Sequence, residues 1–251
     1  MLNHNNTTKK IEAILFDFGG TLFDFYPSNG EIWAQVAAQF GNMISPNDPQ
    51  LLQGLVEQAD ACDRLMLTRS IKLASDIPER EWLELNGIVL SAIGIKDPDA
   101  VLAAQKAFVA REGGYKIFHD SRETLKDLKD FGKHIGLVSN STPKGAAGRR
   151  PILQEQGILD YFESIILSSE VGVAKPDREI FKIALREMNL KNPSQVWHIG
   201  DSYVADVIGA RNAGLIPVLF DPTGLRKPDC LCIQTLSDVV ALVRQFNEET
   251  E

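Results

Sequence analysis

The sequence predicts an α/β fold, a doubly wound parallel sheet with an all-helical segment inserted after its first strand. In the second half of the chain, short runs that are apolar throughout alternate with helical patterns. Strands of a parallel sheet covered on both faces have this character. Between residues 25 and 115, apolar residues instead recur three and four positions apart, which indicates successive helices.

The first strand is the apolar run at residues 14–16, which ends in Asp17. Gly19, Gly20 and Thr21 follow, so a loop with unusual backbone freedom comes directly after the carboxylate. In an open parallel sheet, ligands bind outside the carboxyl ends of the strands. Asp17 is therefore placed where a ligand would bind.

The inserted segment covers residues 25–115, and its ends must lie close together for the core to remain continuous. Asp48-Pro49 and Asp97-Pro98 have the pattern of an N-cap followed by proline at the first helical position. We expect hinges at residues 23–26 and 117–120. Helices are predicted over residues 31–40, 49–68, 79–93 and 98–111.

The core is predicted to comprise residues 10–24 and 116–248. Its later part alternates strictly between strand and helix, as crossover connections in a parallel sheet require. The predicted strands are 134–138, 164–167, 196–199, 216–220 and a weaker one at 231–233, and the predicted helices are 121–131, 144–156, 178–188, 203–213 and 237–246.

Composition favours a soluble, cytoplasmic protein of 251 residues with 44% hydrophobic residues and a net charge of −8. Without a long Lys/Arg-rich run, nucleic-acid binding is not predicted. No apolar run approaches the length of a membrane span, so membrane binding is not predicted either. Arg149-Arg150 is interpreted as a solvated pair. Residues 1–10 are polar, lack the apolar core of a signal peptide, and are expected to form a frayed tail. The three cysteines match no metal motif and favour a reducing compartment.

Polar residues of complementary chemistry follow several predicted strands. Asp17 and Ser139 each end a strand, Asp201 follows another, and Asp206 lies in the helix after it. Lys175 lies in the loop after the strand at 164–167. If these side chains meet at one edge of the sheet, the carboxylates repel one another, and a cation would relieve that repulsion.

Together these segments resemble the phosphatase-like members of the haloacid dehalogenase superfamily, over about residues 11–220. The helical insertion is similar to the cap of that family. The segments occur in the family's order, and the set is far more specific than any single motif. They are Asp17-Phe18-Gly19-Gly20-Thr21-Leu22, Leu137-Val138-Ser139-Asn140, Val173-Ala174-Lys175-Pro176-Asp177 and Ile199-Gly200-Asp201-Ser202-Tyr203-Val204-Ala205-Asp206.

The resemblance implies a Mg²⁺-dependent phosphomonoesterase acting on a small phosphorylated metabolite. Asp17 would be the nucleophile and would form an aspartyl-phosphate. Asp17, Asp201 and the backbone carbonyl of Gly19 would bind the metal, an all-oxygen set suited to Mg²⁺.

The remaining family positions would bind and neutralise the phosphoryl group. Ser139 and the backbone of Asn140 would hold its oxygens, and Lys175 would neutralise charge on it and on Asp17. Asp206 would orient Lys175 or a metal-bound water. Phosphoryl transfer depends chiefly on such positioning and charge neutralisation.

Gly19 departs from the family pattern, which usually has a second aspartate there as general acid and base. Glycine retains the carbonyl but removes a group typically worth about 10²–10⁴-fold in rate. Another residue or water substitutes, or the substrate has a good leaving group, or catalysis is weak or lost. We expect weak-to-moderate phosphatase activity; the alternative is an inactive relative that binds phosphate ligands.

Asp24, Tyr26 and His119 are candidates for the surrogate acid. The simpler interpretation is that Asp24 caps a turn, Tyr26 packs at the hinge and His119 lies at the surface or hinge. His198, within an apolar strand, is expected to be a core histidine. Asp177 is expected to lie at the beginning of a helix.

Two other branches of the superfamily fit less well. Hydrolytic dehalogenases also lack the second aspartate, but they do not need the acidic pair Asp201 and Asp206. Phosphonate-cleaving members use a cap lysine to form a Schiff base. Lys72, Lys96 and Lys106 are the cap lysines open to this role.

Overall fold

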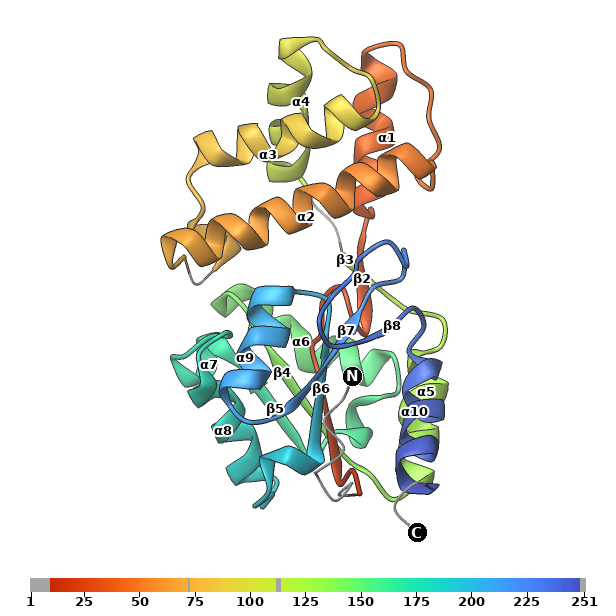
Figure 1. The fold of residues 1–251 in the computed structure, drawn as a ribbon, viewed down its shortest axis with the longest axis vertical. Helices are drawn as coiled ribbons and strands as arrows, with labels where there is room; N and C mark the ends of the chain where they lie inside the picture. Colours follow the sequence, from red (N-terminus) through yellow and green to blue (C-terminus); the bar gives the residue numbers. More distant parts are fainter. Residues whose placement is uncertain (1–9, 72, 112–113, 249–251) are drawn as a thin grey trace. The chain divides into compact units, whose positions relative to one another are not determined.

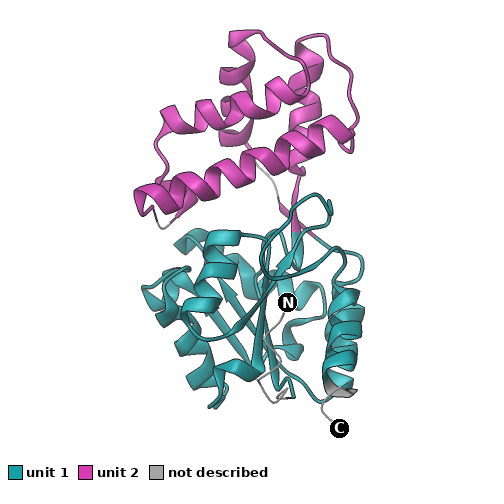
Figure 2. Cartoon of the chain, viewed as in Figure 1, with its two compact units in different colours: residues 1–23, 117–251 teal, residues 24–116 magenta. Residues whose placement is uncertain are grey.

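The computed structural model describes residues 10–71, 73–111 and 114–248. Residues 1–9 and Lys72, for which the sequence suggested a polar tail and a Schiff-base candidate, lie outside the described residues. The chain divides into two compact units, residues 1–23 with 117–251 and residues 24–116 (Figure 2). Among the described residues, no helix has both the length and the apolarity needed to cross a membrane.

The larger unit contains a six-stranded sheet in the order β5-β4-β1-β6-β7-β8 (Figure 1), in which every pair of neighbours is parallel. From β1 the chain runs outward to β5 on one side and then returns to build the other side. The predicted doubly wound topology is therefore confirmed, and β1 lies at its switch point. The strands are β1 Ala13–Phe16, β4 His134–Ser139, β5 Ser164–Leu167, β6 Val196–Gly200, β7 Ile216–Phe220 and β8 Leu231–Ile233.

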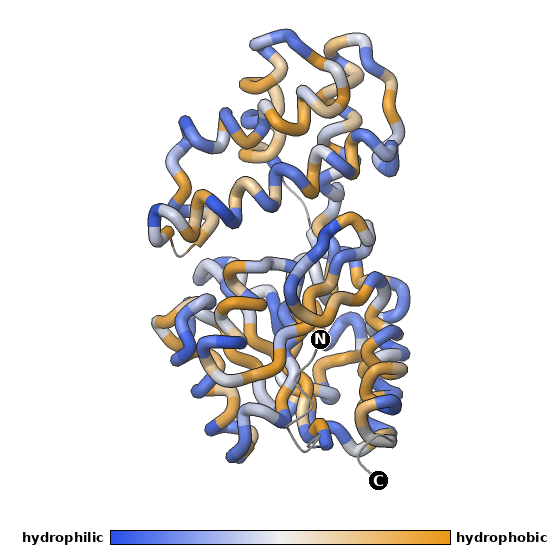
Figure 3. The backbone as a smooth tube through the Cα atoms, viewed as in Figure 1, coloured by the Kyte–Doolittle hydropathy of each residue, from blue (hydrophilic) through white to orange (hydrophobic). Residues whose placement is uncertain are grey.

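Helices cover both faces of this sheet. Helices α5 and α10 contact each other on one side, and α8 and α9 on the other (Figure 1). Apolar residues of β1, β4 and β5 pack against α8 in one buried cluster, and apolar and polar stretches alternate along α10 (Figure 3). The helices are α5 Ser121–Asp130, α6 Pro143–Glu155, α7 Ser168–Val171, α8 Arg178–Glu187, α9 Gly209–Asn212 and α10 Ser237–Glu248, with short 3₁₀ turns at Leu159–Tyr161 and Pro193–Gln195.

The helix predicted at residues 203–213 forms, but it is not α-helical throughout. Tyr203–Ile208, labelled η4, forms a π-helical turn, and α9 follows it. The backbone N–H groups of Asp206 and Val207 both donate to the Ser202 carbonyl. Such widened turns occur often at functional sites, and this one carries Asp206.

In the described part of the smaller unit there are four α-helices and most of a two-stranded sheet. Its helices match the predicted periodicity, and Trp33, Val36, Val89 and Ala104 lie in their common apolar core. The sheet, β2 Phe23–Tyr26 with β3 Gly114–Ile117, was not predicted. Strand β2 coincides with the first expected hinge, and β3 ends where the second expected hinge begins. The helices are α1 Asn29–Gln39, α2 Pro49–Arg69, α3 Glu79–Ala92 and α4 Pro98–Val109, with a 3₁₀ turn at Ala74–Asp76.

The predicted N-caps are confirmed. The Asp48 carboxylate accepts hydrogen bonds from the backbone N–H groups of Gln50 and Leu51. The Asp97 carboxylate accepts one from Asp99. Each aspartate satisfies donors that the first turn of a helix leaves without a partner.

Two glycines within helices of the smaller unit have opposite surroundings. A Cβ at Gly54 of α2 would lie 2.8 Å from the Cβ of Ala92, whereas a Cβ at Gly87 of α3 would meet nothing within 4 Å. Gly54→Ala should lower the free energy of unfolding by about 1–3 kcal/mol through overpacking. Gly87→Ala, the matched control, should raise it by up to about 1 kcal/mol because alanine favours the helix. Urea denaturation compares them, and equal effects would contradict the close helix contact.

Candidate functional site

The carboxyl ends of the parallel strands bring the predicted residues together. Asp17 follows the buried strand β1, Ser139 ends β4, and Asp201 follows β6. Lys175 lies between α7 and α8, and Asp206 lies in η4. All five positions belong to the larger unit.

Lys175 is the buried centre of this group. Its ammonium nitrogen lies 2.7 Å from Oδ1 of Asp17 and 2.5 Å from Oδ1 of Asp206. Burial by itself would lower the pKa of Lys175, but the charges of the two carboxylates outweigh it and raise that pKa above its usual value. Lys175 therefore carries a positive charge throughout the physiological pH range.

Asp206 accepts three hydrogen bonds. Its Oδ1 receives Lys175 and, at 2.8 Å, Nε2 of His198, and its Oδ2 receives the Ser202 backbone N–H at 2.9 Å. Burial favours the protonated acid, yet Lys175 and His198 hold the pKa of Asp206 well below its usual value. Burial lowers the pKa of His198, and Nε2 is the ring nitrogen that faces the Asp206 carboxylate. The predicted core histidine is confirmed and has a defined partner.

Asp201 completes an acidic cluster. Asp17, Asp201 and Asp206 each have a carboxylate oxygen within 4.8 Å of the others. Burial, together with the negative charges of Asp206 and Asp17, raises the pKa of Asp201 well above its usual value. With all groups ionised, three carboxylates around one ammonium leave two excess negative charges. A divalent cation with oxygen ligands fits this donor set.

Two glycines leave room for these carboxylates. A Cβ at Gly20, whose φ is +79°, would lie 2.4 Å from Oδ2 of Asp201. A Cβ at Gly200 would lie 2.1 Å from Cγ of Asp206. Any other residue at either position would displace a carboxylate. The sequence motif contains both glycines, but it does not reveal which side chain approaches each one.

Asn140 has a role that the sequence analysis did not predict. Its side-chain Nδ2 donates to the Lys175 carbonyl at 3.0 Å, and its Oδ1 accepts from the Lys175 backbone N–H at 2.8 Å. This double contact fixes the backbone of Lys175. Ser139 is buried beside it, and its hydroxyl donates to the Asn140 carbonyl at 3.3 Å.

Arg149 corrects the expectation of a solvated basic pair. It is buried in α6, and its guanidinium carbon lies 4.0 Å from the ring centroid of Phe18, the residue after Asp17. Arg150 forms an ion pair with Glu170. The sequence suggested solvation because only tertiary packing brings an aromatic face to Arg149.

No side chain is available at position 19, and the candidate surrogate acids have other environments. The Asp24 carboxylate accepts from the Phe25 backbone N–H at 2.8 Å, as expected for a turn cap. Tyr26 is 57% exposed, and His119 is exposed. Burial raises the pKa of Asp24. Asp177 accepts from the Glu179 backbone N–H and begins α8, as predicted.

A protein-family model described as haloacid dehalogenase-like hydrolase matches residues 11–214. The chain belongs to this family. The match includes Asp17, Ser139, Lys175, Asp201 and Asp206, and it spans the helical insertion.

Curated relatives of this haloacid dehalogenase-like hydrolase include several phosphatases. Ribulose-1,5-bisphosphate 5-phosphatase of Halopiger xanaduensis is 33% identical over 211 residues, which cover 84% of this chain and 85% of that protein. Haloacid dehalogenase-like hydrolase domain-containing protein 3 of Danio rerio is 28% identical over 215 residues, covering 82% and 83%. Phosphoserine phosphatase of Thermus thermophilus is 30% identical over 132 residues, covering 53% and 51%.

Solved structures share the fold. The hydrolase YfnB of Bacillus subtilis has a TM-score of 0.58 at 18% identity, covering 94% of this chain and 99% of its own. A HAD-superfamily hydrolase of Ehrlichia chaffeensis has a TM-score of 0.55 at 20% identity, covering 95% and 98%.

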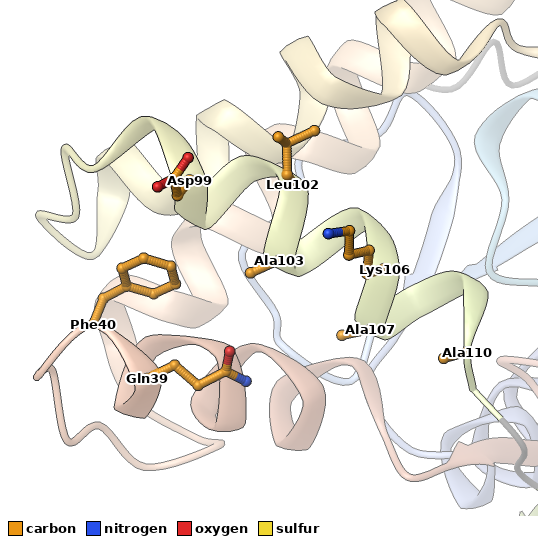
Figure 4. A pocket seen from close by; sticks show the side chains of 8 residues that line it. All are labelled: Gln39, Phe40, Asp99, Leu102, Ala103, Lys106, Ala107 and Ala110. Atoms are coloured by element: carbon orange, nitrogen blue, oxygen red, sulfur yellow. The ribbon is translucent and has the colours of Figure 1, made fainter.

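Lys96 and Lys106, the candidate Schiff-base lysines that the structure describes, do not have the environment that such a role requires. Lys106 is exposed and lines a groove of about 550 Å³ together with Phe40, Asp99 and Leu102 (Figure 4). Lys96 is also exposed. Burial is what makes a lysine amine nucleophilic at neutral pH, and neither lysine is buried.

Replacing Lys175 should show how much the buried ion pairs contribute to the free energy of unfolding. Lys175→Met leaves two carboxylates without their counter-ion and should lower the free energy of unfolding by about 3–5 kcal/mol. Lys182→Met removes a lysine whose ion pair with Glu179 is exposed, and it should cost less than about 1 kcal/mol. Chemical denaturation in metal-free buffer measures both values. A small effect of Lys175→Met would show that water already screens this cluster.

Proposed function

We propose that this hydrolase is a Mg²⁺-dependent phosphomonoesterase that acts on a small phosphorylated metabolite through an aspartyl-phosphate at Asp17. The observation that carries the proposal is the buried Lys175 ammonium, which joins Asp17 and Asp206 within the acidic cluster that includes Asp201. The phosphatase names of its relatives support the substrate class. A cytoplasmic location, which the free thiols of its cysteines suit, belongs to the same proposal.

Asp17, Asp201 and the backbone carbonyl of Gly19 would hold the magnesium ion. When bound, the metal offsets negative charge on the phosphoryl group and on the carboxylates around it. We assign the metal-binding residues to the core, residues 10–24 and 116–248. Residues 25–115 would form the cap that selects the substrate.

In the proposed reaction, Asp17 attacks phosphorus with the oxygen that Lys175 does not hold. The bond from phosphorus to the leaving oxygen breaks, and the leaving group departs with that electron pair. Water then attacks the phosphorus of the aspartyl-phosphate, the phosphorus–Asp17 bond breaks, and inorganic phosphate leaves. Ser139 and the backbone N–H of Asn140 would donate hydrogen bonds to the phosphoryl oxygens, and Lys175 would neutralise charge in both steps.

Gly19 determines which substrates would react well. Without a general acid at this position, an alkoxide leaving group must obtain its proton elsewhere, whereas an acyl or aryl leaving group needs little assistance. We therefore propose faster turnover of acyl and aryl phosphates than of alkyl phosphates. A second candidate function, a phosphate-ligand-binding protein with little or no turnover, is favoured by the same glycine.

Asp17→Asn should abolish turnover of acetyl phosphate and an aryl phosphate in the presence of Mg²⁺, because an amide is a poor nucleophile. Asp130→Asn, which changes an exposed aspartate paired with Lys126, should retain wild-type rates. Phosphate release measures all three proteins. If wild type and Asp17→Asn are equally inactive while phosphate compounds still bind, the binding-protein function replaces this proposal.

Gly19→Asp should raise turnover of alkyl phosphates, by at most about 10²–10⁴-fold, if the missing acid limits the rate. Gly19→Asn is the matched control, since it has nearly the same size and cannot supply that proton. The ratio of kcat/KM for alkyl and aryl phosphates measures the effect. Equal rates for both variants and the wild type would mean that another group already supplies the proton or that position 19 faces away from it.

A further inference from the structure

The loop between β7 and β8 reaches the backbone of Asp201 and is held by hydrogen bonds of its own side chains. Asp221 is buried at the carboxyl end of β7. Its Oδ1 accepts from the backbone N–H and the hydroxyl of Thr223 at 3.1 and 2.6 Å, and its Oδ2 accepts from the Arg226 backbone N–H at 2.8 Å. Gly224, with a φ of +67°, allows the chain to turn between them.

The other end of this loop is attached to the segment that carries Asp206. Asp229 accepts a hydrogen bond from the Tyr203 hydroxyl at 2.7 Å and two from the guanidinium of Arg211 at 2.9 and 3.0 Å. Arg211 and Tyr203 lower the pKa of Asp229 to about 2. Residues 221–229 are therefore held at both ends, and Arg226 lies between the two attachments.

Arg226 contacts the peptide group that follows Asp201. Its Nη1 donates to the Asp201 carbonyl oxygen at 3.1 Å. The N–H of the same peptide group, that of Ser202, donates to Oδ2 of Asp206 at 2.9 Å. Both polar ends of one peptide plane are thus held, and this fixes the backbone angle that directs the Asp201 side chain.

We infer that Arg226 is a positioning residue that orients Asp201 for magnesium. The inference rests on the proposed function, because it assumes that Asp201 binds the metal. Gly20 lies close to the Asp201 carboxylate and confines it on one side. Arg226 holds the backbone of Asp201 through its hydrogen bond to the carbonyl oxygen. Partners that orient metal ligands in this way typically change affinity by about 10–100-fold when removed.

A positioning role and a purely electrostatic role of Arg226 predict opposite changes in Mg²⁺ affinity when Arg226 is removed. Coulomb's law alone predicts that loss of a cation close to Asp201 strengthens Mg²⁺ binding. Positioning predicts that Mg²⁺ binding weakens, because Asp201 becomes free to turn. Arg226→Lys retains the charge and removes the planar guanidinium that reaches the carbonyl, so positioning predicts a weaker site here too.

Isothermal titration of the metal-free, full-length protein with Mg²⁺ tests this without reference to activity. Arg226→Gln and Arg226→Lys should each bind Mg²⁺ about 10–100-fold more weakly than wild type. Lys227→Gln, the exposed neighbour in the same loop, is the control for charge and should bind at least as tightly as wild type. Wild-type or tighter binding by both Arg226 variants would overturn the inference.

Asp201→Asn separates failure of this inference from failure of the proposed function. If Asp201→Asn binds Mg²⁺ as tightly as wild type does, the metal site itself is wrongly assigned. If Asp201→Asn weakens binding and the Arg226 variants do not, only the positioning role of Arg226 is wrong.

Discussion

The buried ammonium of Lys175 is the constraint on which the rest of the site depends. It pairs with carboxylates at positions 17 and 206, and an uncompensated charge at that depth would cost several kcal/mol. Its charge also helps to keep the pKa of Asp206 well below its usual value. The pairing therefore requires that the loop before α8, the end of β1 and η4 converge. The side chain of Asn140 adds to this convergence by holding the Lys175 backbone.

The close packing of these charged side chains also restricts which residues can lie next to them. The carboxylates of Asp201 and Asp206 occupy space that a Cβ would take at Gly20 and Gly200. Packing this close brings the carboxylates near one another and strengthens the electrostatic interactions between them. It also explains why Asp201 tends toward its protonated form when no cation is bound.

Much of the architecture could be predicted from local patterns. Uniformly apolar runs marked the parallel strands, and the 3.6-residue period with Asp-Pro caps marked the helices of the insertion. The short pair β2 and β3 escaped prediction, because four residues contain too little alternation and their pairing depends on chain ends meeting in space. The π-helical turn at Tyr203–Ile208 escaped for a related reason, since contacts of Asp206 with distant side chains accompany it.

The sequence by itself determined the family, the succession along the chain of the strands and helices of the large parallel sheet, and the identity of the residues that end those strands. These features depend on neighbouring residues along the chain. Only the tertiary structure decided which partners those residues have. The decisive contacts join residues far apart in sequence. They are the hydrogen bonds of Asn140 with the Lys175 backbone, the packing of Arg149 on Phe18, and the hydrogen bond of Arg226 with Asp201. Such contacts depend on how the layers pack, which no local pattern encodes.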